Sequence, residues 1–235
     1  MTLDYSDRNV VVTGGTGALG GAVVQTLLDA GAFIFIPAHE RPDSATLPWR
    51  ENGRVKIVAP VDLADERAVE SFYQSLPSLW ASVHAAGGFS AGAIDKTTLA
   101  DFRKMMEINA VTCFLCCREA IRKIRGTSSS AGGRIVNVAA KPALIPTAGL
   151  CAYSASKAAV VNLTLSLSEE LAAEQIWVNS VIPSIMDTPA NRKAMPNADH
   201  ARWPRVSEVA ATIAFLASPQ NAATRGALVP VYGMS

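Results

Sequence analysis

The sequence predicts an α/β protein built on a doubly wound parallel sheet with helices on both faces. Short apolar runs alternate with helical segments along the whole chain, and continuous apolar strands of this kind are typical of parallel sheets covered on both sides. A glycine-rich turn, Thr13 to Gly20, joins the first apolar run to the first helix. Because crossovers between parallel strands are almost always right-handed, the alternation indicates the doubly wound arrangement.

Each expected element is marked by its own apolar or punctuating residues. The first strand is a β-branched run, the second lies between Gly31 and Pro37, and the fourth ends at Gly87-Gly88. The expected strands are Asn9–Thr13, Ala32–Ile36, Val55–Val61, Ala81–Ala86, Arg134–Ala139, Trp177–Ile182 and Leu228–Val231. The first helix is expected from the glycine turn to about Ala30. The other expected helices cover Asp65–Ser75, Leu99–Ile124, Ala152–Glu174 and Val206–Ala217. The Ser/Gly loop at 127–133 is too short for an interdomain linker, so residues 1–235 are expected to form a single domain.

The composition excludes several classes of function. Of the 235 residues, 49% are hydrophobic and 17% charged, which is ordinary for a soluble globular protein, and the net charge of +1 favours no polyanion such as nucleic acid. The polar start of the chain does not resemble a signal peptide, and no apolar run approaches the ~20 residues of a membrane helix. We therefore expect a cytoplasmic protein with no nucleic-acid or membrane partner.

The four cysteines fit the same interpretation. Cys113, Cys116 and Cys117 lie close together on an expected helix, and Cys151 is alone. A metal site on Cys113 and Cys116 would need a second pair of ligands nearby, and the three histidines are scattered along the chain. The sequence therefore predicts no metal, and the thiols are expected to be buried or at an interface.

The glycine-rich turn is expected to bind a dinucleotide. Glycine lets the backbone turn sharply and approach a pyrophosphate, while the following helix N-terminus offers N–H groups and a partial positive charge. Glycine strings also occur in tight turns without a ligand, but the place of this one between a strand and a helix favours the cofactor. The residues expected to contact it are Gly14, Thr16, Gly17, Ala18, Leu19 and Gly20.

The end of the second strand bears on the choice between NAD and NADP. A carboxylate there would bind the ribose 2′-hydroxyl of NAD, but Ala38 stands at the expected position. His39 and Arg41 could meet a 2′-phosphate, whereas Glu40 between them could bind a ribose. The stretch slightly favours NADP, and the alternative that these are only solvated loop charges stays open.

Tyr153 and Lys157 are four residues apart, and hence on one face of an expected helix. Together with the glycine turn, this pair resembles the active-site motif of the short-chain dehydrogenase/reductase family, which has a Rossmann-type fold. The resemblance covers nearly the whole chain, including His84-Ala85-Ala86-Gly87, Glu107-Ile108-Asn109-Ala110, Gly133 to Val138 and Val178 to Pro183. It implies an NAD(P)-dependent oxidoreductase that acts on a small-molecule substrate.

The resemblance also implies roles for individual residues. Tyr153 would donate or accept the proton, Lys157 would favour its phenolate and hold the nicotinamide ribose, and Asn109 would anchor a water beside Lys157. Asp62 would meet the adenine amine and Thr188 the nicotinamide carboxamide, although either could instead cap a helix. The remaining cofactor contacts would come from Leu63, Ala86, Gly87, Pro183 and Ile185.

Three positions depart from the family pattern. Ala18 and Ser184 stand where the family usually has glycine, and Ala140 stands where it has its catalytic serine. The quinonoid dihydropteridine reductases share the loss of that serine. The segment from Asp187 to Asp199, followed by Trp203, lies in the expected substrate loop at about 184–205 and is also similar to theirs.

Three hypotheses follow from the missing serine. A quinonoid dihydropterin is already electron-poor and needs little polarisation, so hydride transfer with a proton from Tyr153 could suffice. A carbonyl or alcohol dehydrogenase could instead use another donor, Ser184 or Thr147. The third hypothesis is a non-catalytic dinucleotide-binding sensor or scaffold, which the retention of Tyr153, Lys157 and Asn109 argues against.

Two apolar helices suggest how copies of the chain associate. The stretches 99–125 and 152–174 are rich in large apolar residues, and in the family the equivalent helices form a dimer interface. The resemblance therefore implies a homodimer or homotetramer, while burial of one helix face against the chain's own sheet accounts for part of the pattern.

Overall fold

Seven parallel strands form one sheet in the residues that the computed structural model describes, 3–40, 47–49, 51–127 and 132–235. The strands are β1 (Asn9–Thr13), β2 (Phe33–Pro37), β3 (Val55–Val58), β4 (Ala81–His84), β5 (Gly133–Val138), β6 (Ile176–Pro183) and β7 (Leu228–Val231). Their order across the sheet is β3-β2-β1-β4-β5-β6-β7. The chain runs outward from β1 to β3 and then returns to β4 on the other side of β1, which confirms the predicted doubly wound sheet.

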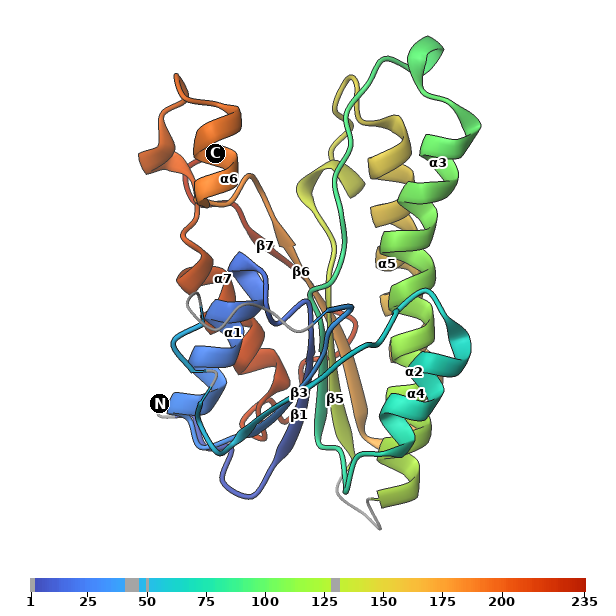
Figure 1. The fold of residues 1–235 in the computed structure, drawn as a ribbon, viewed down its shortest axis with the longest axis vertical. Coiled ribbons are helices and arrows are strands. Elements are labelled where there is room, and N and C mark those ends of the chain that lie inside the picture. The colour runs from blue at the N-terminus through green and yellow to red at the C-terminus, as the bar shows by residue number, and fades with distance from the viewer. Residues whose placement is uncertain (1–2, 41–46, 50, 128–131) are drawn as a thin grey trace.

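Helices cover both faces of the sheet. They are α1 (Ala18–Asp29), α2 (Glu66–Gln74), α3 (Leu99–Met105), α4 (Thr112–Thr127), α5 (Cys151–Glu170), α6 (Pro189–Ala194) and α7 (Val206–Ala217). Figure 1 shows α1 and α7 on one face, and α2, α4 and α5 on the other. Among the described residues, no helix combines the length and the apolar character that a bilayer-spanning segment requires.

The two faces have separate hydrophobic cores, and β1 contributes to both. Val10 and Val12 belong to the core under α1 and α7, whereas Val11 belongs to the core under α2, α4 and α5. All three are fully buried, because successive strand residues point to opposite faces and both faces are covered. This explains why the strands are continuously apolar in sequence.

Several element boundaries differ from the sequence-based prediction for identifiable reasons. The third strand stops at Val58, just before Ala59 and Pro60, since proline has no N–H for the ladder. The fourth stops at His84, because the Ala86 N–H donates instead to the Thr13 hydroxyl oxygen.

The two longest expected helices are also shorter than predicted. A π-helical turn, Met106–Val111, separates α3 from α4. The helix expected over 152–174 ends at Glu170, and a 3₁₀ turn leads to Gln175, whose φ of 57° is left-handed. Residues 128–131 of the expected Ser/Gly loop lie outside the described part of the chain.

The parallel sheet directs the candidate residues to one edge. The segments that follow β1, β4, β5 and β6 leave the carboxyl edge of the sheet, and they carry the glycine turn, Gly87, Ala140 and Ser184. The strand order reverses between β1 and β4, and crevices at such switch points are where open α/β sheets bind their ligands.

Candidate active site

The glycine turn after β1 packs against the backbone that follows β4. Gly14 has a φ of +66°, and a Cβ on it would lie 2.8 Å from the Ala86 nitrogen. A Cβ on Gly20 would collide with the Gly14 carbonyl oxygen. Both positions therefore require glycine. Gly14 needs it for its positive φ and for its contact with the Ala86 backbone, and Gly20 needs it only for its contact with the Gly14 backbone.

The N-terminus of α1 is left open toward the carboxyl edge of the sheet. Gly17 precedes the helix and makes no side-chain capping bond to it. Thr16, Gly17 and Ala18 are exposed, whereas Leu19 and Gly20 are buried. The first N–H groups of a helix have no partner within the helix, so this end can bind an anion such as a pyrophosphate.

Tyr153 and Lys157 both lie on α5, as expected, in different surroundings. The Lys157 side chain is buried, and its Nζ donates a hydrogen bond to the Val138 carbonyl oxygen, 2.8 Å away. Burial lowers the pKa of Lys157 to about 8 and raises the pKa of Tyr153 to about 12. Tyr153 therefore holds its proton at neutral pH in this structure.

Asn109 lies in the π-helical turn and joins three parts of the site. Its Oδ1 accepts from the Gly88 N–H at 3.0 Å, and its Nδ2 donates to the Gly88 carbonyl oxygen at 3.0 Å and to Ser156 Oγ at 3.1 Å. Ser156 in turn donates to the Tyr153 carbonyl oxygen at 2.7 Å. Single π-helical turns are frequent at functional sites, and this one turns Asn109 toward α5.

Asn109 and Lys157 meet beside Gly87. A Cβ on Gly87 would lie 2.5 Å from Asn109 Oδ1 and 3.2 Å from Lys157 Nζ. The structure thus brings Asn109 and Lys157 together at the strand-end glycine, and Ser156 links Asn109 to the main chain of Tyr153. Ser156 was not predicted, because a serine between two recognised motif residues carries no signal of its own until its partner Asn109 is located.

Phe89 is a second residue that sequence reasoning missed. Its ring packs edge-on against the Tyr153 ring, with centroids 5.0 Å apart and an interplanar angle of 72°. The Phe89 side chain is 65% exposed, so most of its surface stays free for contact with a ligand. Its place directly after Gly87-Gly88, at the carboxyl end of β4, was the available signal.

The position of the missing serine is buried and apolar. Ala140 is 5% exposed and lies two residues after Val138, the last residue of β5. Of the two alternative hydroxyl donors, Ser184 donates to the Tyr232 carbonyl oxygen at 2.9 Å and accepts from Ser235 at 2.7 Å. Thr147 donates to the Ile145 carbonyl oxygen at 3.3 Å. Both hydroxyls therefore already donate to main-chain carbonyl groups.

The residues expected around the adenosine lie at the carboxyl ends of β2 and β3. His39 and Glu40 are exposed, and Arg41 lies outside the described residues. Asp62 is exposed, and its Oδ1 accepts from the Ala64 N–H at 2.9 Å. It does not cap α2, because that role belongs to Asp65.

The remaining predicted cofactor contacts lie at or after the ends of β3, β4 and β6. Thr188 Oγ1 accepts from the Asn191 N–H at 3.1 Å and so caps α6, which leaves its hydroxyl hydrogen outside that bond. Ile185 is 43% exposed. The others are half-buried Leu63 and Ala86, exposed Gly87 and buried Pro183.

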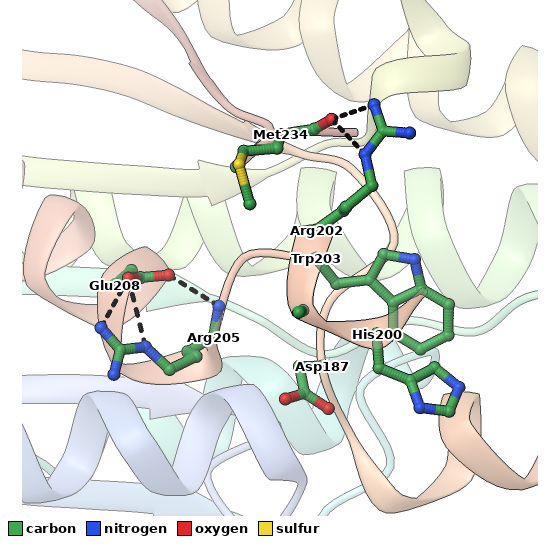
Figure 2. Close-up of a pocket in the computed structure, with 9 residues that line it drawn as sticks. Asp187, His200, Arg202, Trp203, Arg205, Glu208 and Met234 are labelled. Carbon is green, nitrogen blue, oxygen red and sulfur yellow. Dashed lines mark hydrogen bonds and ion pairs between the residues drawn. The ribbon is translucent and has the colours of Figure 1, made fainter. Parts of the chain in front are cut away.

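A pocket of about 400 Å³ lies farther along the expected substrate loop, between the 3₁₀ turn His200–Arg202, the start of α7 and residues 233–234 (Figure 2). Its charged groups bond within the protein: Arg205 with Glu208 at 2.8 Å, and Arg202 with the Met234 carbonyl oxygen at 2.8 Å. Trp203 packs on the His200 ring, with centroids 4.6 Å apart. Tyr153, Lys157 and Asn109 are not among the residues that line this pocket.

Comparisons with known proteins agree with this geometry. The family model described as short chain dehydrogenase matches residues 8–199. The cis-4-hydroxycyclohexanecarboxylate dehydrogenase of Sinomonas cyclohexanicum is 32% identical, over 97% of this chain and 96% of its own. The 3-oxoacyl-[acyl-carrier-protein] reductase of rhamnolipid biosynthesis from Pseudomonas aeruginosa is 29% identical, over 96% and 95%.

Solved structures have the same fold. A mutant of a Serratia marcescens short-chain dehydrogenase/reductase has a TM-score of 0.86 and 26% identity, covering 100% of this chain and 99% of that one. The protein ElxO, solved with NADP bound, has a TM-score of 0.86 at 23% identity, covering 96% and 97%. The latter similarity concerns the fold alone.

Proposed function

The chain belongs to the short-chain dehydrogenase family and is an NAD(P)-dependent oxidoreductase, and from this premise we propose that it reduces a quinonoid dihydropterin or a similarly electron-poor conjugated ring. The observation that carries the proposal is the buried methyl group of Ala140, where the family's hydroxyl would polarise a carbonyl. Ser184 and Thr147, the alternative hydroxyl donors, already donate to main-chain oxygens. A substrate that is already electron-poor needs no such donor.

The dinucleotide would bind at the open N-terminus of α1. The turn that would hold the pyrophosphate is closely packed. Neither Gly14, which lies against Ala86, nor Gly20, which lies against Gly14, has room for a Cβ. Thr16, Gly17 and Ala18 would face the phosphates, with Leu19 and Gly20 supporting them from the core. The adenosine would contact Asp62 and Leu63, and His39 with Arg41 favours a 2′-phosphate and hence NADP.

The nicotinamide end would lie near Tyr153, between Ala86-Gly87 and the segment from Pro183 through Ile185 to Thr188. When bound in its reduced form, the cofactor supplies the hydride. The Lys157 ammonium group donates to the Val138 carbonyl oxygen in this structure, and it would turn away from that oxygen to hold the ribose.

The proton would come from the Tyr153 hydroxyl. Burial keeps that phenol protonated at neutral pH, which suits a proton donor in the reductive direction. The Lys157 ammonium would stabilise the phenolate that remains, and Asn109 and Ser156 position α5 for this step. Phe89 would pack against the substrate ring, since it already packs on Tyr153 and is largely exposed.

A second candidate is oxidation of a secondary alcohol or reduction of a cyclic ketone. It is favoured by the relative at 32% identity that is named for a hydroxycyclohexanecarboxylate substrate. The exposed apolar side chains Phe89 and Ile185 would suit an alicyclic ring as well as a pterin. In this case the carbonyl would be polarised by Tyr153 alone.

We also infer that residues 1–235 act as one domain that assembles into a homodimer or homotetramer. Large apolar side chains are 39–62% exposed along α3, the π-helical turn, α4 and α5, and these are Leu99, Phe102, Val111, Phe114 and Leu165. Because these helices contact one another, the exposed apolar side chains suit a second copy of the chain as partner. Light scattering at micromolar concentration tests this, and a monomer would contradict it.

Steady-state oxidation of NADH and NADPH tests the substrate proposal. Quinonoid dihydropterin would be run beside cyclic ketones, 3-oxoacyl thioesters and aldehydes, with Tyr153→Phe as the inactive control. Turnover of the pterin at least tenfold above the carbonyl substrates is the expected result. Carbonyl turnover alone would favour the second candidate, and turnover of neither class would overturn both.

A further inference from the structure

A buried cluster of sulfur and nitrogen ligand atoms lies between α4 and the sheet. His84 ends β4, and Cys113 and Cys117 lie one turn apart on the face of α4 that packs on it. One potential ligand atom from each residue lies within 4.8 Å of the other two. The three side chains are 3%, 6% and 1% exposed, so the cluster is closed to bulk water.

The Asn137 side chain supplies a fourth potential ligand atom. Its Oδ1 lies 2.8 Å from His84 Nδ1 and 3.5 Å from Cys117 Sγ, and His84 Nδ1 lies 3.4 Å from Cys117 Sγ. A tetrahedral zinc ion with Zn–S of ~2.3 Å and Zn–N of ~2.0 Å holds neighbouring ligand atoms about 3.3–3.8 Å apart. The ligand atoms of His84, Cys113 and Cys117 lie within 4.8 Å of one another, so shifts on the order of 1 Å would bring them to the spacing of zinc ligands.

Hydrogen bonds outside the cluster hold the ligand atoms in place. His84 Nε2 lies 2.9 Å from Ser82 Oγ, which lies 2.8 Å from the Tyr73 hydroxyl. Asn137 Nδ2 donates to Thr164 Oγ1 at 2.9 Å, which turns Oδ1 toward the thiols. Metal-binding histidines usually donate their second ring N–H to such a partner, and this fixes the orientation of the ring.

We propose that His84, Cys113 and Cys117, with the Asn137 side-chain oxygen, form a binding site for a thiophilic d¹⁰ cation such as Zn²⁺. Two thiolates and one imidazole are the ligands that zinc prefers in proteins. The sequence argument against a metal considered Cys113 with Cys116 and missed this set. Cys116 points elsewhere in the core, and the fold brings His84 to the other two cysteines.

Binding is an exchange of protons for the cation, with no change of oxidation state. Each of the two thiols releases its proton to solvent. In the metal-free chain the His84 Nδ1–H donates to Asn137 Oδ1, because an amide oxygen can only accept. Binding therefore requires the imidazole proton to move from Nδ1 to Nε2, where it donates to Ser82 Oγ, and neutral Nδ1 then binds the cation. The proposal does not depend on the substrate of the enzyme.

The test is a titration of the full, metal-free chain with Cd²⁺ and Zn²⁺. Cd²⁺ is followed by the ultraviolet charge-transfer absorption of Cd–thiolate bonds, and Zn²⁺ by competition with a chromophoric chelator. One ion per chain is expected, with the thiolate band present. Cys113→Ser and His84→Asn should each weaken binding on the order of 10²-fold, because each removes a direct ligand.

Two thiol variants serve as matched controls. Cys116→Ala removes an equally buried thiol of α4, and Cys151→Ser removes the exposed one, so both should leave the affinity unchanged. If Cys113→Ser does not fold, as judged by circular dichroism, His84→Asn decides the question alone. Absence of stoichiometric binding, binding without the thiolate band, or binding that His84→Asn leaves unchanged would each overturn the proposal.

Discussion

Lys157 Nζ donates a hydrogen bond to the Val138 carbonyl oxygen at 2.8 Å, and this bond joins the middle of the α5 active-site face to the end of β5. The ammonium group is buried, which lowers the pKa of Lys157 from 10.5 to about 8. Between these two values the unfolded chain binds the proton and the folded chain does not, so stability should rise with pH in this window. Below about pH 8 the folded protein carries the full cost of the buried charge.

Lys157→Met should therefore change stability in a pH-dependent way. Removing the buried charge should raise the free energy of unfolding by about 3 kcal/mol at pH 7, and the loss of the donor to the Val138 carbonyl group offsets part of this gain. The gain should shrink by about 2 kcal/mol by pH 9.5. Urea unfolding of the cofactor-free variant and parent chain at both pH values measures the difference. Lys193→Met, on the exposed surface of α6, is the control and should give a difference that does not vary with pH. A constant difference for Lys157→Met would contradict the lowered pKa.

Tyr153→Phe should remove the proton donor and leave the rest of the site in place. The phenylalanine ring keeps the edge-on packing against Phe89, whose centroid lies 5.0 Å from that of Tyr153. Turnover should fall about 10²–10⁴-fold, the usual contribution of a general acid, while the dissociation constant of NADPH changes less than about threefold. Single-turnover rates and fluorescence titration separate the two effects. Retention of the parent rate would exclude Tyr153 as the donor.

The two directions of the reaction should depend differently on pH. Burial raises the pKa of Tyr153 to about 12, so the protonated donor is fully present from pH 6 to 9 and reduction should not vary with its titration. Oxidation requires the phenolate, so its rate should rise with pH, about tenfold per unit, until the pKa in the complex is reached. The charges of Lys157 and of the oxidised nicotinamide should place that limit below 12. Initial rates in both directions over this range measure the profiles, and an oxidation rate independent of pH would count against a tyrosine base.

The glycine turn offers a matched pair of substitutions. A Cβ at Gly20 would collide with the Gly14 carbonyl oxygen, whereas one at Gly21 would lie at an ordinary 3.7 Å from the Gly15 oxygen. Gly20→Ala should cost about 1–3 kcal/mol of stability and weaken dinucleotide binding at least tenfold. Gly21→Ala should be neutral or slightly stabilising, since alanine favours the helix. Thermal unfolding with and without NADPH distinguishes them, and equal effects of the two would show that the turn does not need its close packing.

The sheet could be predicted from sequence because its signals are local. Val10, Val11 and Val12 are all apolar since both faces are covered, and Gly14 marks the turn at the carboxyl end of β1. The π-helical turn at Asn109 could not be predicted in this way. It is held by bonds to Gly88 and Ser156, partners distant in sequence, and helical periodicity continues through it unchanged.

The same distinction separates the parts of the site that were foreseen from those that were missed. Tyr153 and Lys157 were predicted because their spacing on one helix, together with the glycine turn, resembles a family motif. The cluster of His84 with Cys113 and Cys117 depends on the packing of α4 against β4, and no spacing in sequence encodes that contact. Phe89 lies beside Tyr153 for a similar reason, because β4 ends and α5 begins at the same edge of the sheet.

Ala140→Ser tests why this enzyme lacks the hydroxyl that its family uses. The alanine is buried two residues after Val138, the last residue of β5, whose carbonyl oxygen accepts from Lys157. Serine at position 140 would add one oxygen close to this strand end. If the natural substrate is an electron-poor ring, its rate of reduction should change less than about threefold, while reduction of a cyclic ketone should rise on the order of 10²-fold, since a positioned donor to a developing oxyanion has about that effect. Comparing kcat/KM for both substrates, with Ala139→Ser as the neighbouring control, gives the answer. A large gain with the pterin would mean that its reduction is also limited by polarisation, and the explanation of Ala140 by substrate chemistry would then fail.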